Sequence, residues 1–148
     1  MTLQEKVAAD LNQALKGGAK TRVSVLRLVK AGVKNAEIAK GAPLDDAGVI
    51  DIIVRQVKRN RESIAEFARG NRQDLVAKEE AELATLLEYL PKQMSREEVV
   101  AAARQVMEQV GARGPGDKGK VMSQLMPQLK GRADGREVSD IVAELLTI

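Results

Sequence analysis

The sequence has no cysteine, no histidine and no tryptophan among its 148 residues. These absences exclude disulfides, zinc sites built on cysteine or histidine, the commonest general base and the strongest thiol nucleophile. Only two aromatic side chains are present, Phe67 and Tyr89. Aliphatic residues must therefore fill the core, which is typical of an all-helical protein. Any enzymatic chemistry would depend on carboxylates, lysine, serine, threonine or the single tyrosine.

Long apolar runs are also absent, and none approaches the roughly 18 residues that a membrane-spanning helix needs. The residues after Met1 do not form a charged-then-apolar signal peptide. We therefore expect a cytoplasmic protein. We expect it to bind no membrane, no metal and no cofactor. The formal net charge of +3 is mild for a nucleic-acid-binding protein.

Hydrophobic periodicity predicts one helix after another along the first 90 residues, with no strand. The expected helices run from Leu3 to the Gly17-Gly18 stop, from about Val23 to Gly41, from an Asp45 N-cap to Gly70, and from an Asp74 N-cap to Pro91. The sequence thus predicts an all-α fold with an N-terminal bundle of about four helices in residues 1–90.

A linker over 91–95 is expected to lead to a three-helix C-terminal domain, residues 96–148. Ser95 and Glu98 match a capping box, and Met94 and Val99 are placed to form a hydrophobic staple. The predicted helices cover about 96–110, 118–129 and 136–146. We expect Asp117 to cap the middle one and Pro127 to kink or break it.

Two glycine-hinged basic segments flank this middle helix. Between Arg113 and Arg132 the sequence has five cations and one anion, Asp117. Backbone N–H groups at the helix start, beside two lysines, would suit a phosphate. The alternative is that the glycines only end loops and start helices, and that the cations form a solvated face. The candidate RNA-binding residues are Lys118, Gly119, Lys120, Lys130, Gly131, Arg132 and Arg136.

Two nucleotide-binding sequence patterns occur here without the structural context that they require. Residues 114–119 match GxGxxG, but no predicted strand precedes them, as a dinucleotide site requires. Residues 114–120 match GxxxxGK, but Val121 stands where a P-loop needs a hydroxyl for Mg²⁺. Neither pattern predicts a cofactor.

The segments Gly119-Lys120-Val121-Met122, Lys130-Gly131-Arg132-Ala133-Asp134-Gly135 and Glu88-Tyr89-Leu90-Pro91 resemble the YqeY family, and the likeness runs nearly end to end. The resemblance implies a C-terminal half similar to the tail domain of the B subunit of the glutamine-dependent tRNA amidotransferase, a tRNA-contacting module. It carries binding over to six positions, which are Gly119, Lys120, Gly131, Arg132, Ala133 and Asp134. Lys118 departs from the family, in which an apolar residue is common at that position.

Three functions follow as hypotheses. The first is a non-catalytic, tRNA-associated binding module that contacts the RNA backbone. The second is a protein–protein adaptor whose N-terminal helices dock a tRNA-charging or tRNA-amidating enzyme, such as an aminoacyl-tRNA synthetase or an amidotransferase component. The third is a carbon–nitrogen ligase activity with glutamine as amido donor, only as part of a larger complex. Nothing in the sequence matches an ATP site or a glutaminase nucleophile.

A second basic stretch runs from Lys16 to Lys40, with seven cations against Glu37 alone. It is able to follow a nucleic-acid backbone or, alternatively, to offset the acidic fourth helix. Carboxylate pairs such as Asp45-Asp46 and Glu97-Glu98 lie at predicted helix starts, where a role in capping explains them without acid–base chemistry.

Overall fold

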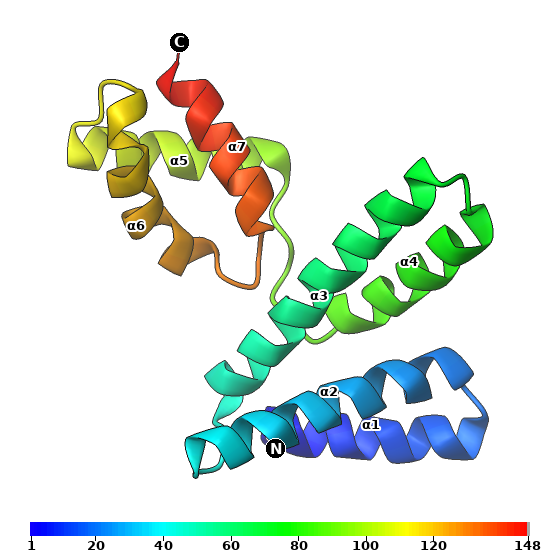
Figure 1. The fold of residues 1–148 in the computed structure, drawn as a ribbon. Coiled ribbons are helices and arrows are strands. Elements are labelled where there is room, and N and C mark those ends of the chain that lie inside the picture. The colour runs from blue at the N-terminus through cyan, green and yellow to red at the C-terminus, as the bar shows by residue number, and fades with distance from the viewer. Residues whose placement is uncertain (148) are drawn as a thin grey trace. The chain divides into compact units, whose positions relative to one another are not determined.

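The computed structural model describes residues 1–147, which form seven α-helices and one short 3₁₀ helix. No strand occurs in this part of the chain, so the predicted all-α class is confirmed. The helices divide into two compact units that separate after Leu90 (Figure 1). None of the described helices is long and apolar enough to cross a membrane.

The first unit contains four helices: α1 (Leu3–Gly17), α2 (Lys20–Lys40), α3 (Asp46–Arg69) and α4 (Gln73–Leu87). Two long antiparallel pairs, α1 with α2 and α3 with α4, are visible in Figure 1. Helix α2 also contacts α3 and α4. Their shared core is aliphatic apart from one tyrosine, and its fully buried members include Val25, Leu26, Val29, Val49, Ile53 and Leu86.

Most predicted helix ends in this unit are confirmed. Asp45 caps α3 by accepting the Gly48 N–H at 2.9 Å. Gly18 and Gly41 end α1 and α2 in the left-handed conformation that glycine tolerates best. The predicted Asp74 cap is wrong, because the N-cap of α4 is Arg72 and the Asp74 carboxylate pairs with the Arg72 side chain at 2.9 Å.

The second unit contains α5 (Arg96–Val110), the 3₁₀ helix η1 (Pro115–Asp117), α6 (Lys118–Leu129) and α7 (Gly135–Leu146). Each α-helix contacts the other two. They enclose a separate core of aliphatic residues: Val99, Ala103, Val106, Val121, Leu125, Leu129, Val138, Ile141, Val142 and Leu146.

The capping box at the start of α5 is confirmed, with Ser95 and Glu98 each bonding the other's backbone N–H. The Met94 side chain packs against the core cluster that contains Val99, as a staple requires. Pro127 does not break α6, which continues through it to Leu129; the predicted kink stays a prediction. Pro127 itself is exposed, while Leu125 and Leu129 on either side are almost wholly buried and hold the last turn in place.

Candidate nucleic-acid interface

The predicted RNA-binding residues lie at the two ends of α6. Lys118, Gly119 and Lys120 form its first turn, whereas Lys130, Gly131 and Arg132 follow its last residue. Helix α6 has twelve residues, so Lys118 and Lys130 are about 18 Å apart along its axis. Figure 1 shows α6 and α7 as an antiparallel pair, so Arg136 in the first turn of α7 lies at the Lys130 end. The structure therefore divides the predicted site in two.

The first turn of α6 has no carboxylate and receives no side-chain cap hydrogen bond. Lys120 is exposed and Lys118 half-buried. Cations at a helix N-terminus oppose the helix dipole, so this arrangement lowers stability and raises the local positive potential. One predicted feature is wrong: the Lys118 N–H is bonded to the Pro115 carbonyl within the preceding 3₁₀ turn, and is not free for an anion.

Gly119 has no structural reason to be glycine. A Cβ built at this position meets no atom within 4 Å, and the backbone does not adopt a positive φ. Glycine inside a helix costs about 0.5–1 kcal/mol relative to alanine. This exposed glycine leaves the backbone of the first turn bare, so a partner can approach it closely.

Asp117 stands at the N-cap position of α6, but the prediction that its side chain caps the helix is wrong. Its carboxylate accepts the Arg113 backbone N–H at 2.9 Å and closes the preceding loop. That hydrogen bond is the main reason why the pKa of Asp117 is lowered, and the charge of Lys120 contributes to the shift. The anion nearest to the two lysines is thus already engaged by the loop.

The loop after α6 is tied to the segment before α5. The Gly131 carbonyl accepts a hydrogen bond from the Gln93 side chain at 2.7 Å, and the Arg132 carbonyl accepts the Met94 N–H at 2.8 Å. The Arg132 Nε donates to the Lys92 carbonyl at 3.3 Å. We call Lys92, Lys130 and Arg132 the basic corner. Residues 91–94, predicted as part of a linker, therefore hydrogen-bond within the second unit.

Gly131 differs from Gly119 because the fold requires it. Gly131 is buried and adopts φ +77°, a conformation that costs other residues roughly 1–2 kcal/mol. Its role is to turn the chain so that Arg132 reaches Lys92. The sequence does not reveal the contribution of Lys92 and Gln93, because their contacts span about 40 positions.

The remaining loop residues add a mixed charge. Asp134 occupies the N-cap position of α7 without a side-chain cap hydrogen bond, and the exposed Arg136 is followed by Glu137. The pKa of Glu98 is lowered chiefly by the Ser95 backbone N–H, with smaller contributions from the positive charges of Lys92 and Arg132. The positive charges of Lys92 and Arg132 therefore also stabilise the ionised carboxylate of Glu98, which caps α5.

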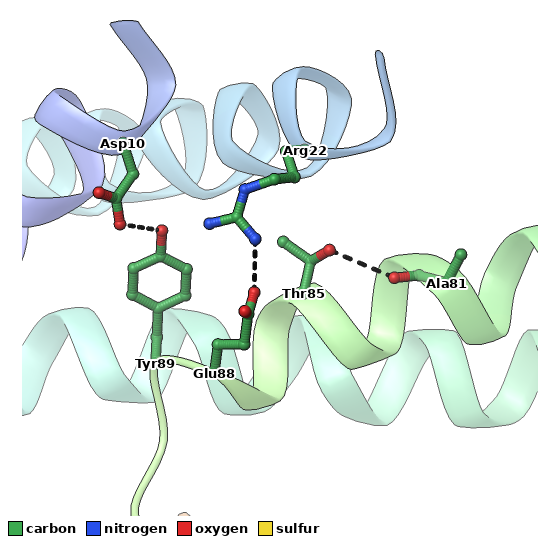
Figure 2. A network of polar contacts seen from close by, with 6 residues as sticks. All are labelled: Asp10, Arg22, Ala81, Thr85, Glu88 and Tyr89. Carbon is green, nitrogen blue, oxygen red and sulfur yellow. Dashed lines mark hydrogen bonds and ion pairs between the residues drawn. The ribbon is translucent and has the colours of Figure 1, made fainter. Parts of the chain in front are cut away.

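A polar network in the first unit was not predicted. Figure 2 shows the Tyr89 hydroxyl aimed at Asp10 of α1, with a donor–acceptor distance of 2.5 Å. Arg22 of α2 pairs with Glu88 at 2.6 Å beside it. The Lys6 ammonium lies 5.4 Å from the centre of the tyrosine ring. These contacts fasten the end of α4 to α1 and α2.

The environment of Tyr89 favours its protonated form. Burial, and then the hydrogen bond to Asp10, raise the pKa of Tyr89 well above its ordinary value. The phenol therefore stays protonated at neutral pH and does not act as a base or nucleophile. The second basic stretch, residues 16–40, is also interpreted as offsetting the acidic fourth helix. The Arg22–Glu88 pair supports that interpretation at one position. No three carboxylates gather to hold a metal ion within residues 1–147.

The chain is similar over almost its full length to known proteins. Residues 4–146 match the family model described as Yqey-like protein. The chain is 31% identical, over 95% of its length and 79% of the relative's, to Altered inheritance of mitochondria protein 41, mitochondrial, of Pyrenophora tritici-repentis. It is 36% identical to the Kluyveromyces lactis protein of that name over 66% of this chain and 55% of the relative, and 35% identical to the Lachancea thermotolerans protein over 55% and 44%.

The names of these relatives place them in mitochondria, whereas a cytoplasmic location for this chain stays a prediction. The family model covers both units and includes both ends of α6. It also covers the Tyr89 network and the loop of the basic corner. The chain belongs to the Yqey-like protein family.

Proposed function

We propose that this chain is a non-catalytic, tRNA-associated binding module whose second unit contacts the RNA backbone. The observation that carries the proposal is the first turn of α6, where Gly119 lies open between two lysines and no carboxylate is present in the turn. A glycine inside the helix and cations at its N-terminus each lower the stability of the helix. Binding of a phosphate would explain Lys118, Gly119 and Lys120 together. The phosphate would bring negative charge to the helix start, and it needs close access to the backbone.

The basic corner supports the same function at the other end of α6. Its loop is held by three hydrogen bonds, so Lys130 and Arg132 are presented from an ordered backbone. Since about 15 Å of helix separates the corner from Lys120, the two clusters would contact different phosphates of a folded RNA. No aromatic residue occurs in the second unit. Recognition would therefore depend on shape and charge more than on stacked bases.

The test measures tRNA binding to the full chain, with duplex DNA as competitor, at about 50 and 200 mM salt. We expect the Lys118→Glu/Lys120→Glu double variant to lose at least about tenfold in tRNA affinity, with a log–log salt slope smaller by about 1.5. The same variant should unfold at equal or higher denaturant concentration, because carboxylates at this helix start favour the dipole.

The matched control is Lys58→Glu/Arg104→Glu, which reverses two exposed cations in the middle of α3 and α5. Both double variants change the net charge equally. An equal loss of tRNA affinity in both would reduce the effect to general electrostatics and contradict the proposed site. Unchanged affinity in the Lys118/Lys120 variant would contradict it as well.

A further inference from the structure

The first unit leaves apolar side chains exposed on one side of α2. Apart from Met1, the large hydrophobic residues exposed in the described part of the chain are Leu15 (47%), Leu28 (55%) and Ile38 (71%). Leu28 and Ile38 belong to α2, and Leu15 lies near the end of α1. Ile38 follows Ala31 by two helical turns and shares its face. The core of the unit does not use this face.

Leu28 and its neighbour Ala31 line two open grooves, which they join. The first has a volume of about 750 Å³ and is lined also by Leu15 and Val23. The second, of about 450 Å³, continues onto α3 past Ile52. We call the two together the α2 groove. Helices α2 and α3 approach each other closely at Gly32, in the second groove. A Cβ added to Gly32 would lie 2.8 Å from the Ile52 side chain.

The charge around the α2 groove has one sign. Its lining includes Lys20 and Arg27 of α2 and Arg55 and Arg59 of α3, and includes no carboxylate. None of these four cations forms an ion pair within residues 1–147. The surface therefore combines an apolar stripe with a positively charged border.

We propose that the α2 groove binds an acidic amphipathic helix of a partner protein. Such a helix places apolar side chains at i, i+3/i+4 and i+7 along one stripe, which would contact Leu15, Leu28 and Ala31. Carboxylates beside that stripe would face the four unpaired cations. A nucleic-acid backbone would use the cations but would gain nothing from the leucines, so the apolar stripe favours a protein.

A second copy of this chain is a poorer match. Its most acidic helix is α4, but Leu83, Leu86 and Leu87 of that helix already pack into the core of the first unit. Helix α4 therefore offers carboxylates without a free apolar stripe. This inference is independent of the proposed tRNA site, because the two surfaces belong to different units of the chain.

The probe is a fluorescein-labelled synthetic peptide of about 18 residues, or five helical turns, with leucines at helical spacing and glutamates on both flanks. Two further peptides replace either the glutamates by lysine or the leucines by glutamine. Anisotropy reports affinity, and amide shifts of the ¹⁵N-labelled full chain report the binding site. We expect saturable binding of the first peptide only, with shifts along α2 from residue 20 to residue 38.

Leu28→Gln should weaken this binding at least about tenfold, since it removes a central apolar anchor. Because Leu28 is exposed, its replacement leaves the core intact, and Lys58→Glu on the same unit serves as the control. No binding, binding unaffected by Leu28→Gln, or equal binding of the glutamine peptide would overturn the proposal. So would α2 shifts that depend on protein concentration alone, which would indicate self-association.

Addition of tRNA to the same labelled sample keeps the two proposals separate. Shifts in α6 with an unperturbed α2 would support both assignments. Shifts of the α2 groove by tRNA, with the acidic peptide competing, would overturn the protein-partner proposal and assign the groove to RNA. Absence of any tRNA effect would contradict the proposed function alone and leave the peptide result unaffected.

Discussion

Helices α5 and α6 of the second unit begin in opposite ways. Helix α5 has a complete capping box and two glutamates in its first turn. Helix α6 has no side-chain cap hydrogen bond and no carboxylate in its first turn, and it carries Lys118 and Lys120 there. Since the dipole favours negative charge at a helix start, α5 follows the rule for stability and α6 departs from it. The comparison separates a start that holds the fold from one that is open to a ligand.

The two glycines at the ends of α6 should show the largest difference. Gly131→Ala should lower the free energy of unfolding by about 1–2 kcal/mol, because alanine is strained at positive φ. Gly119→Ala should raise it by about 0.5–1 kcal/mol, because the site is open and helical. Urea unfolding of the two variants measures both effects. Changes of the same sign would contradict the assignment of one glycine to the fold and the other to binding.

Much of this architecture is predictable from sequence because it depends on local signals. The apolar spacing and the Ser95, Asp45, Gly18 and Gly41 caps act within one or two turns, and they locate most of the helix ends, although α2 begins at Lys20 and α4 already ends at Leu87. The errors arise where a distant or competing partner decides the outcome. Asp74 and Asp117 are good cap residues by type, but an arginine side chain and a loop N–H engage their carboxylates instead.

The candidate site was predictable only in part, for the same reason. Its residues lie in two short segments that can be found by their glycines and cations. Their division between the two ends of α6, and the tie from Arg132 to Lys92, depend on tertiary structure. The Tyr89–Asp10 bond joins residues 79 positions apart, and no local pattern indicates it.

Removal of the α5 cap should have the next largest effect. Ser95→Ala should cost about 1 kcal/mol, because the Glu98 backbone N–H loses its acceptor. Ser95→Asp restores an acceptor and should recover most of that loss. In the middle of α6, Ser123→Ala is a control for a serine on an exposed helix face, where its hydroxyl donates only to the Lys120 carbonyl. Thermal unfolding of the three variants would test the comparison, and an equal cost for Ser95→Ala and Ser123→Ala would contradict it.

The smallest expected effect is the pH dependence of the two helix starts. The pKa of Glu98 is lowered by the Ser95 N–H, and that of Asp117 by the Arg113 N–H. A carboxyl whose pKa is depressed by folding stabilises the protein above its unfolded pKa, near 4, and loses that contribution as pH falls through the folded value. The stability difference between wild type and Glu98→Gln should therefore shrink from about pH 6 to about pH 3, and the same should hold for Asp117→Asn.

Neutralising Lys120 should reduce the pH dependence assigned to Asp117 and leave that of Glu98 unchanged, because Lys120 contributes to the shift of Asp117 and not to that of Glu98. Equal changes at both carboxyls would show that net charge, and not the local structure of each helix start, controls their titration.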